Sequence, residues 1–163
     1  IISSSMDVVD PIQTSFIQAL RGIASTVSII SCKVNLDKQA MTATSIASLS
    51  LEPPSMLVCV NKESSIHKIM KEGSIFCINV MNRDQKDIAE ICSIRGNEDR
   101  RFDLGNWEEI EEVPFNKDSQ SNIFCFCEKL VNHNTHTLFI GKVVKVINNM
   151  SADPLIYKDG KYL

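Results

Sequence analysis

The densest group of side chains that could bind a small molecule is a hydroxyl-rich run between Met41 and Ser50. Ser or Thr occupies five of the nine positions from 42 to 50, where a predicted strand gives way to a loop. Hydroxyls and free backbone N–H groups together can bind a neutral polar ring or a phosphate. Composition alone also fits, and favours, a hydroxyl-rich edge or turn that bonds only to its own backbone.

A second polar group runs from Asn61 to His67, after an apolar strand and at the start of a short predicted helix. A helix N-terminus with Lys62 and Ser65 beside it can bind an anion. The simpler alternative is an ordinary helix cap, with Lys62 in solvent.

The third group is His133-Asn134-Thr135-His136, between two long predicted strands. A histidine in this turn could donate a hydrogen bond to a substrate carbonyl or carry a proton, or it could simply be a surface residue. Cys125 and Cys127 share one face of the preceding strand. Their spacing from the two histidines fits no common zinc module, so we expect no metal site.

Several classes of protein are disfavoured by what the sequence does not contain. It has no Gly-rich dinucleotide fingerprint, no P-loop and no G-x-S-x-G motif. The net charge of −3 does not favour nucleic-acid binding, and no apolar run approaches the ~20 residues of a membrane helix. The six cysteines are expected to be reduced thiols, mostly buried, and no basic-then-apolar leader is present, which together predict a cytoplasmic protein.

The elements that must position these groups form one expected domain over residues 1–163, with 1–10 as a flexible N-terminal extension. Asp10 and Pro11 are typical of a helix start, and the spacing of Ile12, Phe16, Leu20 and Ile23 predicts an apolar face turned toward the core. Residues 93–122 look polar and irregular. Pro53 and Pro54 donate no ladder hydrogen bonds, so residues 51–54 are not expected to form a central strand. Strands are predicted over 26–32, 39–44, 56–61, 75–80, 123–131 and 138–147, helices after Ser65 and over 84–92, and a terminal hairpin over 154–162. These elements suggest a mainly β, closed antiparallel barrel with short helices inserted.

Taken in order, the motifs resemble those of the flavin reductase family with the FMN-binding split β-barrel, a Greek-key antiparallel barrel. The resemblance covers roughly Phe16 to Leu163 and is specific as an ordered set. Its motifs are Met41–Ser45, Ser48–Pro54, Val58–Lys62, His67, Phe76-x-x-Asn79-Val80, Asp84-Gln85, Arg101-Phe102, and His136 followed by Ile140-Gly141.

The resemblance implies an NAD(P)H:flavin oxidoreductase that binds FMN, or FAD, and uses NADH or NADPH as co-substrate. It further implies a homodimer and a possible monooxygenase partner that receives reduced flavin. The apolar character of both faces of 123–131 independently favours a dimer. The implied flavin-binding residues are Met41, Thr42, Ala43, Thr44, Ser45 and Ser50 near the ring, and Asn61, Lys62, Ser65 and His67 near the ribityl phosphate.

His136 is implied to face the nicotinamide and is the expected catalytic residue. Two positions depart from the family pattern: Thr135 stands where an Asp is common, and Ile66 where a Thr is common. Thr135 slightly favours the alternative function, a non-enzymatic FMN-binding electron-transfer protein with the same barrel.

Overall fold

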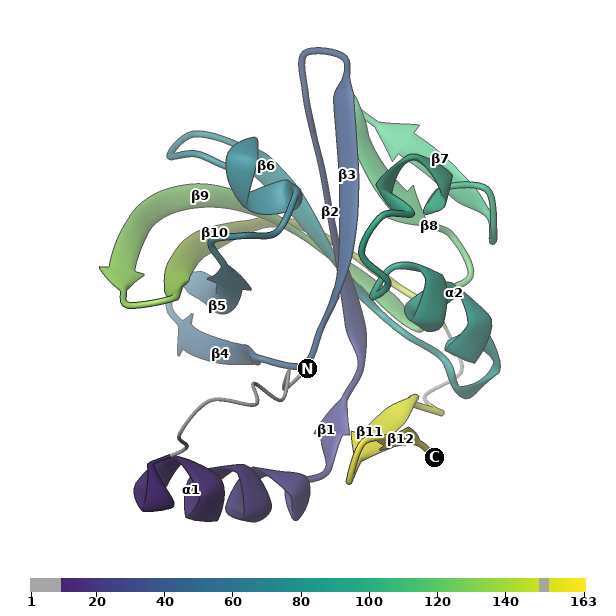
Figure 1. The fold of residues 1–163 in the computed structure, drawn as a ribbon. Coiled ribbons are helices and arrows are strands. Elements are labelled where there is room, and N and C mark those ends of the chain that lie inside the picture. The colour runs from purple at the N-terminus through teal and green to yellow at the C-terminus, as the bar shows by residue number, and fades with distance from the viewer. Residues whose placement is uncertain (1–9, 150–152) are drawn as a thin grey trace.

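The computed structural model describes residues 10–149 and 153–163 (Figure 1). The predicted N-terminal extension therefore lies outside the described residues, except for Asp10, whose carboxylate caps the first helix by accepting from the N–H of Ile12 at 2.9 Å. The elements in chain order are α1 (Pro11–Arg21), β1 (Ser25–Thr26), β2 (Ser28–Val34), β3 (Asp37–Ala43), β4 (Ile46–Leu51), β5 (Pro54–Asn61), η1 (Ile66–Lys68), β6 (Ile75–Val80), η2 (Arg83–Gln85), α2 (Lys86–Ile91), η3 (Glu98–Arg100), β7 (Trp107–Ile110), β8 (Val113–Asn116), β9 (Ser121–His133), β10 (His136–Asn148), β11 (Ile156–Lys158) and β12 (Lys161–Tyr162).

The fold is built on a seven-stranded antiparallel sheet with the order β3-β2-β6-β9-β10-β5-β4. Hairpins join β2 to β3, β4 to β5 and β9 to β10, and the remaining pairings join strands that are distant in sequence (Figure 1). The two edge strands, β3 and β4, are connected directly by Thr44 and Ser45 but are not paired with each other. The sheet is thus a barrel that is split between these two edges, which confirms the predicted mainly β split-barrel fold.

The barrel interior is filled by apolar side chains from both halves of the sheet, including Ile30, Val60, Phe76 and Phe139. Gly141 is required at the point where the strands approach most closely. A Cβ atom there would lie 2.7 Å from the Cβ of Cys125 and 2.9 Å from the ring of Phe76. This close packing fixes the register of β10, and hence the position of the turn at its start.

The stretch from 93 to 122, predicted to be irregular, contains the β7–β8 hairpin and packs on the outside of the barrel. A buried amide network holds it there. The side chain of Asn79 donates to the carbonyl of Ile29 at 2.8 Å and accepts from the backbone N–H of Asn116 at 2.9 Å and from Nδ2 of Asn122 at 2.8 Å. The prediction failed because both strands have only four residues and because their contacts, those of the buried Val113 and Phe115 included, are long-range, so the local apolar pattern is too short to mark them.

The predicted loop over 46–50 was also wrong, because these residues form the edge strand β4, which pairs with β5. Leu49 and Leu51 are exposed on it, so its sequence lacks the alternation of a half-buried strand. Pro53 lies in the turn, but Pro54 is the first residue of β5, a strand paired on both sides, so the prediction that these prolines exclude a central strand is wrong for Pro54. Pro54 pairs opposite Leu51 at the end of the strand, where proline is tolerated.

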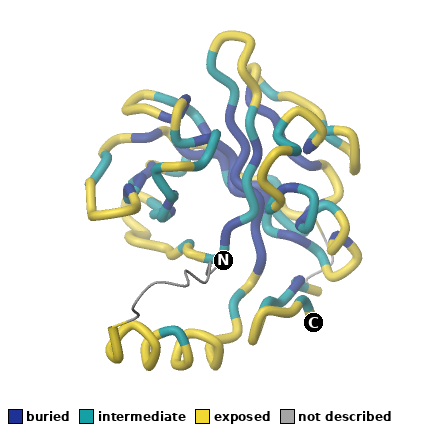
Figure 2. Tube along the Cα trace, in the orientation of Figure 1, coloured by how far each residue is buried: buried dark blue, intermediate teal, exposed yellow. Residues whose placement is uncertain are grey.

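Helix α1 forms as predicted, but its apolar face does not pack on the core. Ile12 is 77% exposed, Phe16 58% and Ile23 57%, and no residue of the helix is buried (Figure 2). Its C-terminal end is held to the β11–β12 hairpin by the bond from the Asp159 N–H to the Arg21 carbonyl at 3.1 Å. Among the described residues, no helix is long and apolar enough to span a membrane.

Candidate active site

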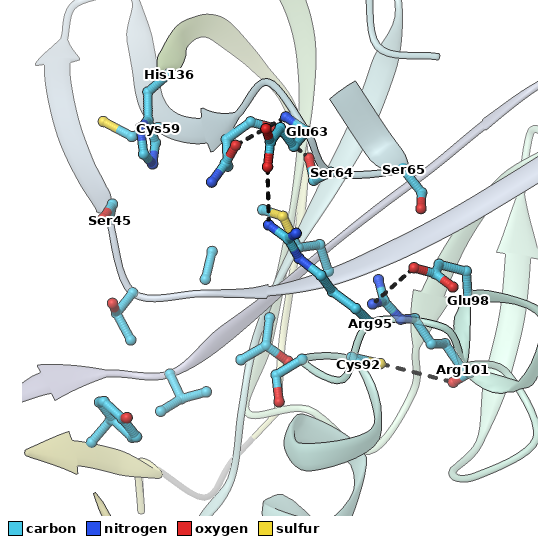
Figure 3. Close-up of a pocket in the computed structure, with 18 of the residues that line it drawn as sticks. Ser45, Cys59, Glu63, Ser64, Ser65, Cys92, Arg95, Glu98, Arg101 and His136 are labelled. Carbon is cyan, nitrogen blue, oxygen red and sulfur yellow. Dashed lines mark hydrogen bonds and ion pairs between the residues drawn. The ribbon is translucent and has the colours of Figure 1, made fainter. Parts of the chain in front are cut away.

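A cavity of about 510 Å³ opens at the end of the barrel where β3 ends, β5 ends and β10 begins (Figure 3). Its volume is in the range of small-molecule and cofactor sites. Two walls can be distinguished. The barrel wall consists of residues 41–45, Cys59, Asn61 and His136, and the loop wall of residues 63–65 and the pocket-lining residues between 92 and 101. The C-terminal hairpin adds Tyr157 and Tyr162, whose rings meet edge-to-face at 5.2 Å.

The hydroxyl-rich run enters the barrel wall at the split between the two edges. Thr42 is still part of β3, and its hydroxyl donates to the carbonyl of Ala89 at 2.6 Å, so it fastens α2 to the barrel. Thr44 and Ser45 form the corner between β3 and β4, where Ser45 accepts from the Cys59 N–H at 3.0 Å. Because the pairing of β3 with β2 ends at Ala43, Thr44 and Ser45 leave the strand and line the cavity at this corner.

The turn after β5 is rigid because its own polar atoms are used within it. The Asn61 side chain accepts from the N–H of Glu63 at 2.9 Å, and the Asn61 carbonyl accepts from the N–H and the hydroxyl of Ser64 at 3.1 and 2.7 Å. The N–H of Lys62 donates to the carbonyl of Thr135 at 3.0 Å, which joins this turn to the turn that carries His136.

His136 is the first residue of β10 and pairs opposite Asn61, so strand register places it at the cavity rim. Its Nδ1 lies 2.8 Å from the Thr135 hydroxyl, which holds the ring and leaves Nε2 available to the cavity. Figure 3 shows His136 beside Cys59 on the barrel wall, across from the charged residues of the loop wall. Thr135 thus supplies an orienting contact at the position where the family often has an Asp.

The loop wall is organised by the buried side chain of Arg101. Its guanidinium donates to the carbonyls of Ala40 at 2.6 Å and Ile94 at 2.9 Å, and lies 3.9 Å from the carboxylate of Glu98. Hydrogen bonds from the backbone N–H groups of Glu98 and Gly96 lower the pKa of Glu98, which therefore remains ionised. Arg101 ties the loop after α2 to β3 beyond the point where the Thr42 N–H donates to the Cys92 carbonyl at 3.2 Å, so the distal part of this loop is held by a side chain rather than by strand pairing.

Eight of the eleven predicted site residues line the cavity. Ser50 lies instead on the exposed edge strand, where its hydroxyl accepts from the Glu52 N–H at 3.3 Å. Lys62 and His67 do not line the cavity either: His67 bonds through Nε2 to the Thr137 hydroxyl at 2.8 Å, and burial followed by the Lys62 charge lowers its pKa. The eight lining residues are Met41, Thr42, Ala43, Thr44, Ser45, Asn61, Ser65 and His136.

Sequence reasoning missed most of the loop wall and the C-terminal contribution. Arg101 was one of the motifs, but nothing local marks it as pocket-lining. Cys59 could have been found, because it alternates with Val58 and Val60, which point into the core. The missed lining residues with polar or ionisable side chains are Cys59, Glu63, Ser64, Cys92, Ser93, Arg95, Glu98, Arg101, Tyr157 and Tyr162.

The two pocket cysteines are poor nucleophiles. Burial raises the pKa of Cys59, and raises that of Cys92 to about 12. Because the thiolate is the reactive form, neither is suited to covalent catalysis. All six cysteines are free, and among the described residues no group of three or more His, Cys, Asp or Glu side chains is arranged to hold a metal ion.

Comparison with known proteins shows the family of the chain. Residues 20–163 match the family described as "Flavin reductase like domain". The chain is 30% identical over 151 residues to the reductase component of the FADH(2)-dependent resorcinol hydroxylase of Rhizobium sp. (strain MTP-10005), covering 91% of this chain and 84% of that protein. It is 27% identical over 151 residues to the FMN reductase (NADH) RutF of Pseudomonas syringae pv. syringae (strain B728a), covering 92% and 85% respectively.

The structure of the flavin reductase PheA2 superposes with a TM-score of 0.83 at 27% identity, covering 95% of this chain and 97% of that chain. The chain therefore belongs to the flavin reductase-like family and is an enzyme of that oxidoreductase class, as the resemblance implied.

Proposed function

We propose that this protein reduces a flavin, bound in the cavity, with NADH or NADPH. The observation that carries the proposal is the meeting of the Thr44–Ser45 corner with His136 in one cavity. The residues fit the group: a hydroxyl-bearing corner could face the polar edge of a ring, Tyr157 and Tyr162 supply aromatic surface, polar and charged side chains line much of the remainder, and the cavity is large enough for a cofactor. When bound, the flavin supplies the hydride acceptor.

The chain itself contributes position and electrostatics. The hydroxyls of Thr44 and Ser45 can donate to the polar edge of the ring, where negative charge develops on reduction. His136 can donate from Nε2 to the nicotinamide carboxamide while Thr135 holds Nδ1. Holding the two reactants in fixed relative positions lowers the barrier without any covalent step, which agrees with the raised pKa of the two pocket thiols, Cys59 and Cys92.

We further propose FMN as the flavin, with FAD as a second ligand, and NADH as a coenzyme. The support is the name of the Pseudomonas syringae relative, an FMN reductase (NADH). The Rhizobium relative is the reductase component of a hydroxylase, which supports a second proposal: that reduced flavin is passed to a separate monooxygenase. The six free cysteines support a reducing, cytoplasmic location for this protein.

Helix α1 supports a homodimer. It has only 11 residues and none is buried, whereas isolated helices shorter than about 12–15 residues are marginal in water. We propose that a second copy covers its apolar face. Sedimentation equilibrium should give twice the chain mass of 18.2 kDa, and Phe16→Glu should shift the protein to the monomer. Gln13→Glu, on the polar side of the same helix, is the matched control and should leave the dimer intact. A monomeric wild type at micromolar concentration would contradict the proposal.

The flavin proposal is tested by thermal unfolding with added ligand. A ligand that binds only the native state stabilises it, by about 2.7 kcal/mol at 100 times its Kd. FMN should raise the Tm in proportion to the logarithm of its concentration. No shift with either FMN or FAD at millimolar concentration would exclude flavin binding.

A further inference from the structure

One ion pair crosses the cavity mouth from one side of the loop wall to the other. Nη2 of Arg95, from the loop after α2, lies 3.5 Å from Oε2 of Glu63, from the turn after β5. Both residues line the cavity, and Figure 3 shows the Arg95 side chain reaching over the opening toward Glu63. Their side chains are 76% and 75% exposed.

This pair differs from the other ion pair of the same wall. Arg101 is 6% exposed and both of its terminal nitrogens donate to backbone carbonyls, so it cannot turn toward a ligand. Arg95 has no other hydrogen bond or ion pair within 10–149 and 153–163. Among the cavity-lining arginines and lysines, Arg95 is therefore the one that can exchange its partner.

The energetics favour such an exchange. An exposed ion pair contributes about 0–1 kcal/mol, because both ions remain hydrated and two long side chains must be held. A phosphate group carries up to two negative charges and can accept two parallel hydrogen bonds from a guanidinium. The interaction of Arg95 with a phosphate is therefore more favourable than its pairing with the Glu63 carboxylate. The Glu63 carboxylate repels any phosphate that binds without displacing Glu63 from Arg95.

The sequence had predicted Lys62 for the phosphate, but its position does not support that role. Lys62 does not line the cavity, and its charge acts on His67, whose pKa it lowers after burial. Ser64 and Ser65, which do line the cavity, lie on the Glu63 side of the opening (Figure 3). The Ser64 hydroxyl donates to the Asn61 carbonyl at 2.7 Å, so Ser65 is the residue of this turn whose hydroxyl could donate to a phosphate near Arg95.

We infer that Arg95 is the specificity residue for the phosphate attached to the ribityl chain of the flavin, and that Glu63 is its built-in competitor. Without a phosphate the two residues pair across the mouth. A phosphate-bearing flavin takes Arg95 from Glu63, while riboflavin, which has no phosphate, leaves the pair in place. This inference rests on the proposed flavin function and adds to it a basis for discriminating among flavins.

The test measures the Kd of riboflavin, FMN and FAD by quenching of flavin fluorescence, so it does not depend on turnover. Arg95→Met should weaken FMN and FAD binding about 10- to 100-fold, the loss expected for a hydrogen bond to a charged group, and leave riboflavin unchanged. Glu63→Gln should tighten FMN binding about two- to fivefold. The Kd of FMN reports on binding of a terminal phosphate, and the Kd of FAD reports on binding of the first phosphate of a pyrophosphate.

Arg100 and Asp103 supply matched controls. They form an exposed ion pair at 3.9 Å that does not line the cavity, so Arg100→Met and Asp103→Asn should change none of the three Kd values. Equal losses for riboflavin and FMN in Arg95→Met, or a loss of FMN binding in Lys62→Met instead, would overturn the inference.

The flavin affinities of the wild-type protein distinguish a failure of the Arg95 inference from a failure of the proposed flavin function. Wild type that binds riboflavin as tightly as FMN overturns the role of Arg95 and leaves the flavin function standing. Wild type that binds none of the three flavins overturns the proposed function and this inference together.

Discussion

The two walls of the cavity are held in place by different kinds of interaction. In the barrel wall, strand register places His136 opposite Asn61, and a backbone hydrogen bond joins Ser45 to Cys59. The loop wall has no strand pairing across the cavity. Apart from the Asn61 turn and one backbone bond from the Thr42 N–H to the Cys92 carbonyl, it is held by the buried guanidinium of Arg101. A side-chain substitution in the barrel wall leaves the backbone hydrogen bonds of the strands in place. A substitution of the buried Arg101 removes several stabilising interactions at once. The barrel wall should therefore tolerate side-chain changes that the loop wall does not.

The largest effect is expected at Arg101. Arg101→Met leaves the carbonyls of Ala40 and Ile94 without their donors and removes a charge beside Glu98, which should lower the free energy of unfolding by about 3 kcal/mol. Urea unfolding monitored by circular dichroism measures this change. Arg100→Met, one residue away and exposed, should cost less than about 0.5 kcal/mol. Equal costs for the two variants would remove the proposed difference between the walls.

His136, on the barrel wall, should show the opposite behaviour: a loss of function with little loss of stability. His136→Ala removes one orienting hydrogen bond and should lower kcat/KM for NADH or NADPH about 5- to 150-fold, with flavin Kd and Tm unchanged. His133, at the other end of the same turn and outside the cavity, is the matched control. If His136→Ala releases flavin, or if the His133 and His136 variants behave alike, the proposed role is wrong.

Substitutions of Thr135 test whether its hydroxyl orients the ring of His136. Thr135→Val removes the contact to Nδ1 of His136 and should lower kcat/KM about 2- to 12-fold, the range for one neutral hydrogen bond. Thr135→Ser keeps the hydroxyl and should restore the rate. Should Ser fail to rescue, the loss in Thr135→Val comes from the turn itself. Thr135→Asp, which introduces the carboxylate common in the family, should match or exceed the wild-type rate.

The smallest effect concerns His67, behind the barrel wall. Burial and then the charge of Lys62 lower its pKa below the ordinary value of 6.5, so the unfolded chain binds this proton more readily than the folded one. Stability should therefore rise with pH through the window that ends near pH 6.5, and fall as the pH drops below it. Urea midpoints between pH 5 and 7.5 measure the slope, and His67→Gln should flatten it. An unchanged slope in that variant would assign it to other groups.

The barrel wall could be predicted from the sequence more completely than the loop wall. The barrel wall was found because β3, β5 and β10 carry strong local signals and the ordered motifs span the corner between them. Strand β4 was missed because an exposed edge strand such as this one, with Leu49 and Leu51 in solvent, has no buried face to impose alternation. The inward face predicted for α1 was wrong because amphipathicity shows that a helix needs a partner, without showing that the partner is in the same chain.

The loop wall could not be predicted because its contacts join residues that are distant in the sequence. Arg101 is separated from Ala40 by 61 residues, and Arg95 from Glu63 by 32, and neither contact leaves a periodic pattern. The sequence pointed to Lys62 for a phosphate, and its role there stays a prediction. Glu63, the next residue, lines the cavity and Lys62 does not, which a local pattern could not show.

The proposed function requires that this cavity bring a flavin and a nicotinamide coenzyme together for hydride transfer. The most direct measurement is the anaerobic bleaching of oxidised FMN absorbance by NADH, and separately by NADPH, with protein at a small fraction of the flavin concentration. We expect bleaching through many turnovers with at least one coenzyme, greatly slowed in His136→Ala and unaffected in His133→Ala. Bleaching no faster than in a protein-free control with either coenzyme, for FMN and FAD alike, would contradict the claim.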